Sequence, residues 1–157
     1  MQELSSPALV KSAQRARSKL GYALIILPLI GLIISGYLWS AKAGATAFIC
    51  GGLSDCESVN MSFYSSIGDI PIAAAGAMVY LALTGLGIVT VRQGRKANPT
   101  LTMIAFVLAF AGALYSLYLT GVEAFILRAY CIWCVCSWII ITILAVLWWR
   151  RNQEVSA

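Results

Sequence analysis

The chain has 157 residues, of which 61% are hydrophobic and only 11% are charged. Soluble globular domains carry about 25% charged residues, so this chain has too few charges to cover a water-facing surface. The composition therefore excludes an ordinary soluble domain and indicates an integral membrane protein. The formal charge of +5 comes mainly from basic clusters beside apolar segments. Such clusters act as topology signals, so we predict no nucleic-acid partner.

Four uncharged apolar segments follow one another along the chain. They comprise residues 20–41, 70–91, 101–122 and 129–149. Each approaches or exceeds the roughly 20 residues with which an α-helix spans the hydrocarbon core. Their apolar residues do not alternate, and unpaired backbone is too costly in lipid for an open sheet. We therefore predict an all-α integral membrane protein built as a four-transmembrane-helix bundle.

Basic residues gather on one side of these four segments. Nine of the eleven lie before the first segment, between the second and third, or after the fourth. The positive-inside rule then places residues 1–19, the 92–100 loop and the tail 150–157 in the cytoplasm. Four of the six acidic residues lie on the opposite side. We expect that side to be the periplasm or lumen bordering a bacterial inner, or thylakoid-like, membrane.

The segment between the first two spans, residues 42–69, is long for a connection. A loop of about 28 residues is uncommon unless it has a function. Ser54 or Asp55 is placed to cap a short helix that begins near Cys56. Five apolar side chains of this segment are unlike those of a solvated loop: Phe48, Val59, Met61, Phe63 and Tyr64. We expect an extracytoplasmic lid, with a short helix, lying on the membrane surface.

Four of the five cysteines form two pairs at the boundaries of the apolar segments. Cys131 and Cys134 are a CxxC motif at the start of the fourth span. The free N–H groups and the dipole of a helix N-terminus favour a thiolate on the first cysteine, which is the species that attacks disulfides. Cys50 and Cys56 lie in the outer loop, with Gly51-Gly52 between them. The arrangement predicts a mobile outer dithiol that relays electrons to a helix-mounted inner one.

Other readings of the cysteines remain open at this point. Both pairs could be structural disulfides, which persist in oxidising compartments. All four could bind one zinc ion, but the five-residue gap is unlike zinc spacing, and we predict no metal site. Cys136 is expected to be an inert apolar residue. The chain has no histidine, which excludes a Ser-His-Asp or Cys-His hydrolase within it.

Electrons that reach Cys131 and Cys134 need an acceptor at the bilayer boundary. No flavin, nicotinamide or phosphate-binding fingerprint is present, so a membrane quinone is the natural candidate. A four-helix bundle can hold a flat ring between helices. Small residues that allow a slot or close helix packing occur at Gly76, Gly112, Ala113, Gly121 and residues 73–75.

Taken together, these motifs resemble the vitamin K epoxide reductase family, particularly its bacterial members. The resemblance covers residues 20–149. It rests on Cys50-x5-Cys56, on Ser62 six residues later, on the spacing of Gly76 and Tyr80, and on the CxxC that starts the fourth span. In DsbB-type thiol oxidases the CxxC follows the first span instead. Two positions depart from the animal enzymes, where asparagine and tyrosine stand in place of Ile72 and Trp138.

The resemblance implies a role for each cysteine. Cys50 exchanges with the thiols of a thioredoxin-like protein or domain, Cys56 links transiently to Cys131, and Cys134 faces the quinone. Ser62 resembles the family's loop Ser/Thr beside the active centre. The expected quinone contacts are Ser62, Cys134, Trp133, Ala113 and Leu117. Many bacterial members carry a fused thioredoxin-like domain, and we expect this chain to represent the membrane domain without it.

The leading hypothesis is a thiol:quinone oxidoreductase that supports disulfide formation, with a quinone of the ubiquinone, menaquinone or plastoquinone type as cofactor. One alternative is a non-enzymatic membrane scaffold with structural disulfides. Another is a DsbB-type thiol oxidase, which the order of the motifs disfavours. A transporter that carries reductant across the bilayer would need reactive cysteines on both faces, and we predict none on the cytoplasmic face.

Overall fold

A computed structural model describes residues 7–50 and 55–156 of the chain. Four long helices make up most of it: α1 (Pro7–Lys42), α3 (Ile72–Gln93), α4 (Pro99–Val122) and α5 (Ile132–Ser156). Each contains an apolar stretch long enough to cross a membrane. The predicted four-helix membrane bundle is confirmed.

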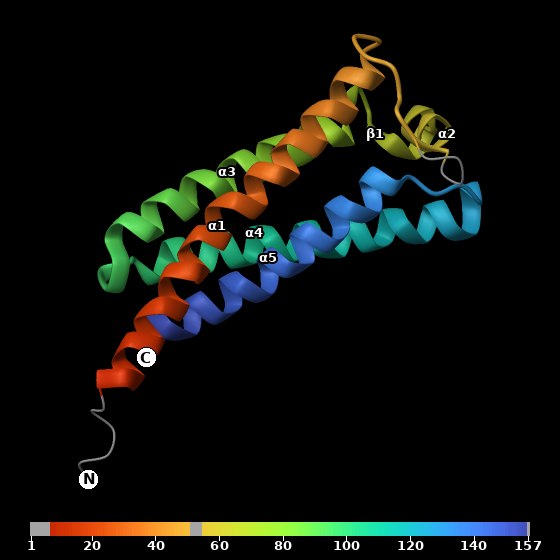
Figure 1. The fold of residues 1–157 in the computed structure, drawn as a ribbon. Coiled ribbons are helices and arrows are strands. Elements are labelled where there is room, and N and C mark those ends of the chain that lie inside the picture. The colour runs from red at the N-terminus through yellow and green to blue at the C-terminus, as the bar shows by residue number, and fades with distance from the viewer. Residues whose placement is uncertain (1–6, 51–54, 157) are drawn as a thin grey trace.

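The helices pair side by side along their length. Helix α1 packs along α3, and α4 packs along α5, with further contacts between α1 and α5 and between α3 and α4 (Figure 1). A single buried cluster joins the four helices: Leu24, Tyr80, Leu83, Ala105, Ala109, Ile141, Leu144, Ala145 and Trp148. The core is narrow, because each helix gives it only a few side chains.

Many large apolar side chains point away from this core. Ile33 and Met78, for example, are 71% and 67% exposed. In water such a surface would cause aggregation, whereas lipid tails solvate it as well as a protein interior does. The outward faces of the helices therefore support a membrane environment.

Two glycines allow the helices to approach closely. A Cβ at Gly31 of α1 would overlap the ring of Tyr80, and a Cβ at Gly87 of α3 would overlap the backbone carbonyl of Leu24. Small residues at such contacts are the usual means of packing helices in membranes, where dispersion forces act only at short range. These two contacts fix how α1 and α3 lie against each other.

The ends of the helices differ from the ends of the four apolar segments identified in the sequence. Helix α1 begins at Pro7, well before residue 20, and α5 continues beyond residue 149 to Ser156. The second membrane-spanning helix, α3, begins at Ile72 and not at residue 70. Ile70–Pro71 forms strand β2 instead, which pairs antiparallel with β1 (Ser66–Ile67). Helices can extend past the hydrocarbon core into the polar region, where hydropathy no longer marks them.

The connection between α3 and α4 is short. A 3₁₀ turn, η3 (Gly94–Lys96), follows α3, and the Asn98 side chain then accepts a hydrogen bond from the Thr100 backbone N–H at 2.9 Å. Pro99 occupies the first turn of α4, where a missing N–H costs nothing. This tight turn keeps α3 and α4 antiparallel neighbours.

The lid predicted between the first two spans is a folded segment. It contains helix α2 (Cys56–Met61), the 3₁₀ turn η2 (Phe63–Ser65) and the β1–β2 hairpin. Asn60 of α2 is buried and donates to the Leu38 carbonyl at 3.0 Å. Lys42 Nζ donates to the Ser65 carbonyl at 3.2 Å and to Ser66 Oγ at 2.8 Å. These bonds fix the lid to the end of α1.

Candidate functional site

The outer cysteine pair forms a disulfide at the end of the bundle. Cys50 and Cys56 are bonded, with their Cα atoms 6.1 Å apart. Cys56 is completely buried at the first position of α2. Asp55 caps that helix by accepting a hydrogen bond from the Ser58 N–H at 3.1 Å. The Ser58 side chain, and to a smaller extent this N–H, lower the pKa of Asp55 by hydrogen bonding. The short helix predicted to begin near Cys56 is therefore confirmed, with Asp55 as its cap; Ser54 lies outside the described residues.

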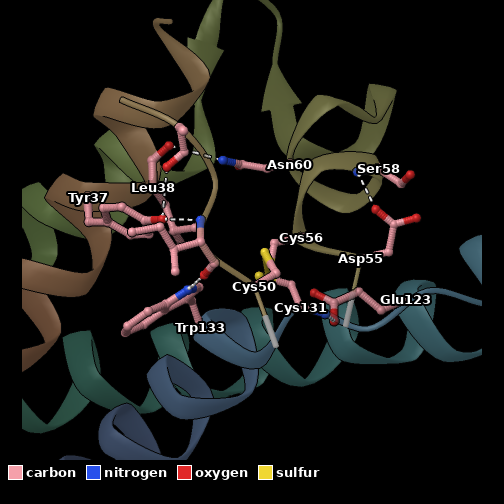
Figure 2. The surroundings of a disulfide bond; sticks show 12 residues. Tyr37, Leu38, Cys50, Asp55, Cys56, Ser58, Asn60, Glu123, Cys131 and Trp133 are labelled. Carbon is pink, nitrogen blue, oxygen red and sulfur yellow. Dashed lines mark hydrogen bonds between the residues drawn. A yellow bond between two sulfur atoms is a disulfide. The ribbon is translucent and has the colours of Figure 1, made fainter. Parts of the chain in front are cut away.

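The inner pair lies where the CxxC motif predicted it, at the N-terminus of a long helix. Cys131 immediately precedes α5 and is completely buried, while Cys134 lies in the first turn and is half-buried. Both are free thiols, as is Cys136. Cys131 belongs to the same buried cluster as Cys56, and Figure 2 shows it beside the Cys50–Cys56 disulfide. The two pairs therefore meet through Cys56 and Cys131.

Two hydrogen bonds align the cysteine segments, and Figure 2 draws the first of them. Trp133, inside the CxxC motif, donates its indole N–H to the Ile49 carbonyl at 2.9 Å, next to Cys50. The Asp55 N–H, next to Cys56, donates to the Tyr130 carbonyl at 3.0 Å. Ile49, which precedes Cys50, is thus hydrogen-bonded to Trp133 inside the CxxC motif. Asp55, which precedes Cys56, is hydrogen-bonded to Tyr130, the residue before the motif.

Tyr37 of α1 supports the first of these two bonds. Its hydroxyl donates to the Ala47 carbonyl at 3.1 Å and accepts from the Ile49 N–H at 2.6 Å. Its ring lies against the Trp133 ring, with centroids 5.3 Å apart. We call Tyr37, Ile49 and Trp133 the Trp–Tyr clamp. The clamp connects α1, the segment before Cys50 and the start of α5.

The two inner thiols differ in their surroundings. A hydrogen bond from the Cys134 thiol holds the pKa of Cys131 below its ordinary value, and the N–H groups of Cys134 and Trp133 act in the same direction. Burial and the charge of Glu123 oppose this effect without overcoming it. The direction agrees with the thiolate that a helix N-terminus favours on the first cysteine. Cys131, the thiol whose pKa is lowered, lies beside the outer disulfide.

Glu123, one of the four acidic residues on the side opposite the basic clusters, lies at this site. Glu123 is 3% exposed and begins the π-helical turn η4 (Glu123–Leu127) that continues α4. Its Oε2 accepts a hydrogen bond from the Cys131 N–H at 3.2 Å, and its carboxyl is within hydrogen-bonding reach of the Cys134 thiol. A single acidic residue at the end of an apolar segment forms no sequence pattern from which its burial could be predicted. Glu123 is buried because it begins the η4 turn, which directs it inward.

A cavity opens behind the inner pair, between the lid and the helices. Its volume is about 390 Å³, within the range of small-molecule pockets. The lining is mostly apolar, and small residues leave the space, among them Ala73, Ala75, Gly76 and Gly112. The polar groups that reach it include those of Cys134, Glu123, Asn60 and Ser62. An apolar slot with few polar groups beside a thiol suits a flat, weakly polar ring such as a quinone.

Two of the five expected quinone contacts line this cavity, and three do not. Cys134 lines it directly, and Ser62 lines it while its hydroxyl donates to the Val59 carbonyl at 2.7 Å. Trp133 belongs to the clamp instead. Ala113 packs against the helical core, and Leu117 is half exposed on the outer surface.

Several other residues line the cavity that were not among the five expected quinone contacts; of these, Gly112 was expected only as a small residue that allows a slot. Tyr80 of α3 reaches the cavity, and its hydroxyl donates to the Ser137 carbonyl at 2.9 Å. Ile72 also lines it. On α4 the lining face contains Ala111, Gly112, Tyr115, Ser116 and Leu119.

Comparison with known proteins supports these observations. Residues 22–149 match the vitamin K epoxide reductase family, and the matched region contains both cysteine pairs, the whole of α3 and α4, and parts of α1 and α5. A search of curated protein sequences gave no match. The family is one of membrane oxidoreductases associated with quinone or vitamin K substrates. The chain belongs to the vitamin K epoxide reductase family.

Proposed function

We propose that the protein is a thiol:quinone oxidoreductase that supports disulfide formation outside the cytoplasm. The observation that carries this proposal is the position of the inner cysteine pair between two environments. Cys131 lies in the same buried cluster as Cys56 on one side, and Cys134 lines the apolar cavity on the other. A dithiol in that position is suited to pass electrons from a protein thiol to a lipid-soluble acceptor.

The first half of the reaction is thiol–disulfide exchange. A reduced thioredoxin-like partner gives two electrons and two protons to the Cys50–Cys56 bond, which becomes two thiols, and the partner leaves with its own disulfide. The Cys56 thiolate then attacks Cys131 of an oxidised inner pair, which releases the Cys134 thiolate. Cys50 next attacks Cys56, so the outer disulfide forms again and Cys131 is freed. The bonded outer pair and the free thiols of the inner pair are consistent with such an exchange.

The second half returns the inner pair to its disulfide. Cys131 and Cys134 form an S–S bond and give two electrons to a quinone in the cavity, which takes up two protons and becomes the quinol. The chain's own residues supply the apolar slot, the polar groups of Ser62 and Asn60, and the thiol of Cys134. The lid covers the slot, which limits access of water to the reacting thiol.

The proposed orientation follows from charge. Both cysteine pairs lie at one end of the bundle, and the Gly94–Lys96 turn and the end of α5 lie at the other (Figure 1). The basic residues gather at that second end, so we place it in the cytoplasm. The cysteines then face the oxidising periplasm or lumen, where a disulfide-forming enzyme is needed.

Quinol formation by purified protein tests the proposal. Protein in lipid nanodiscs is given dithiothreitol and a short-chain ubiquinone, and quinol is followed by absorbance. We expect turnover that Cys134→Ala abolishes and Cys136→Ala leaves intact, since Cys136 is outside both pairs. A membrane scaffold with static disulfides predicts no turnover in any of the three proteins, and that result would refute the proposal.

A further inference from the structure

Glu123 is a buried acid that the proposed thiol chemistry does not yet use. The fold holds it in place on both sides: its main-chain carbonyl accepts from the Ala129 N–H at 3.2 Å, and its Oε2 accepts from the Cys131 N–H at 3.2 Å. The carboxyl lines the cavity and neighbours the Cys134 thiol. It therefore contacts both the thiol and the space where an acceptor would bind.

Other groups near the carboxyl are poor proton carriers at neutral pH. The titratable groups that line the cavity with it are Tyr64 of the lid, Tyr80 of α3, Tyr115 of α4 and Cys134 of α5, while α1 contributes Ser35 and Leu38. Tyrosine hydroxyls ordinarily titrate near pH 10. No lysine or arginine lines the cavity among the described residues, and the chain has no histidine. Glu123 is thus the one cavity carboxyl that can exchange a proton with a thiol.

We propose that Glu123 is the proton carrier of the quinone half-reaction: its carboxylate takes the proton of the Cys134 thiol and delivers it to the acceptor oxygen in the cavity. This inference rests on the proposed thiol:quinone function and adds a residue to it. Histidine is the usual general base in such a role, and a carboxylate replaces it here. The hydrogen bond from the Cys131 N–H keeps the carboxylate aligned while the proton moves.

The proposed step balances in atoms and electrons. The Cys134 S–H bond breaks, and its proton forms an O–H bond on Glu123. Cys134 and the Cys131 thiolate then form an S–S bond and give up two electrons. A quinone that accepts these electrons receives one proton from Glu123 and a second from water, since Cys131 had already released its proton. Glu123 ends the step as a carboxylate, ready for another turnover.

A substitution can separate proton transfer from hydrogen bonding at this position. Glu123→Gln keeps an oxygen that can accept from the Cys131 N–H, but it cannot carry a proton. Exchange between Cys56 and Cys131 does not use the carboxyl, so it should survive. Loss of a general acid–base group typically slows the dependent step roughly 10²- to 10⁴-fold. We therefore expect Glu123→Gln to exchange disulfides normally and to reduce quinone at least 100-fold more slowly.

The experiment measures both half-reactions and one property of the quinone-free protein. Single-turnover quinol formation and mass mapping of the cysteines are compared in the parent protein, Glu123→Gln and Glu123→Asp. Infrared spectra of the reduced, quinone-free proteins report the S–H stretch of Cys134, identified by its absence from Cys134→Ala. A carboxylate is a stronger acceptor than an amide, so this band should lie at lower frequency in the parent than in Glu123→Gln.

The outcomes separate this inference from the function on which it rests. If the parent protein forms no quinol, the proposed function fails. If the parent is active and Glu123→Gln reduces quinone within threefold of it, or if its Cys134 band is unshifted, the inference about Glu123 is wrong. If Glu123→Gln loses disulfide exchange as well as quinone reduction, the quinone-reduction rate of Glu123→Asp decides whether the inference holds. Quinone reduction at a tenth of the parent rate or more in Glu123→Asp supports proton transfer, and a lower rate contradicts it.

Discussion

The indole N–H of Trp133 and the carbonyl of Ile49 are joined by a hydrogen bond of 2.9 Å. This contact connects the middle of the CxxC motif to the residue that precedes the first outer cysteine. Because Cys131 is buried against Cys56, the exchange between them requires the two segments to stay in register. The Trp–Tyr clamp supplies that register without taking part in the chemistry.

Trp133→Phe tests the clamp. Phenylalanine keeps a ring against Tyr37 but removes the N–H donor. A single hydrogen bond contributes about 0.5–1.5 kcal/mol, so we expect Cys56–Cys131 exchange to slow by roughly 2- to 13-fold. Trp149→Phe, near the opposite end of the same helix, should leave the exchange rate unchanged. Rapid-quench alkylation with mass mapping measures the rate, and equal rates in the two variants would contradict a role for the clamp.

The acidity of Cys131 gives a second prediction. The Cys134 thiol is the main cause of its lowered pKa, and a serine hydroxyl can replace that donor. Cys134→Ser and Cys134→Ala both lack the resolving thiol, so each should accumulate the Cys56–Cys131 bond. The rate at which the Cys56–Cys131 bond forms rises with pH as Cys131 ionises. The midpoint of this rise should lie at lower pH in Cys134→Ser than in Cys134→Ala. Coincident pH profiles would mean that Cys134 does not stabilise the Cys131 thiolate.

Helix packing gives a third prediction, independent of the chemistry. Gly87→Ala places a methyl group against the Leu24 carbonyl, whereas Gly85→Ala on the same helix meets nothing within 4 Å. Overpacking a fitted contact typically costs about 1–3 kcal/mol. We expect Gly87→Ala to lower the thermal unfolding temperature in detergent and Gly85→Ala to change it little. Similar shifts in both variants would contradict the described contact between α1 and α3.

The cavity gives a fourth prediction. Gly112 lines it, and a Cβ there would already lie 3.1 Å from the Ile141 side chain. Gly112→Leu should therefore raise KM for quinone by about tenfold or more, equivalent to about 1.4 kcal/mol of binding. Gly121→Leu on the same helix is the control, because that position is open and does not line the cavity. Steady-state kinetics measure both, and an unchanged KM in Gly112→Leu would place the quinone elsewhere.

The sequence predicted the parts of this protein that depend on composition and local pattern. Uncharged runs of about 20 residues can only be helices in lipid, and the four helices are present. Asp55 before Cys56 is a local capping signal, and it caps α2 as expected. The CxxC motif was likewise placed at a helix start, because its position relative to the apolar run is readable directly.

The side of each helix that faces the cavity could not be predicted in the same way. A soluble helix shows its inner face by the contrast between apolar and polar residues, and α4 lacks that contrast because lipid and core are both apolar. Ala113 and Leu117 were therefore expected at the quinone, whereas Gly112 and Ser116 line the cavity. The inward position of Glu123 depends on the π-helical turn η4, and no local sequence pattern predicted that turn.

The central claim is that electrons leave the chain through the Cys131–Cys134 pair. It is tested most directly by adding one equivalent of quinone to protein in which this pair is reduced and Cys50–Cys56 is oxidised. Quinol and disulfides are then quantified in the same sample. The account predicts one Cys131–Cys134 bond for each quinol formed, with Cys50–Cys56 unchanged and Cys136 still a thiol. Quinol formed without that bond, or a new bond to Cys136 in its place, would contradict it.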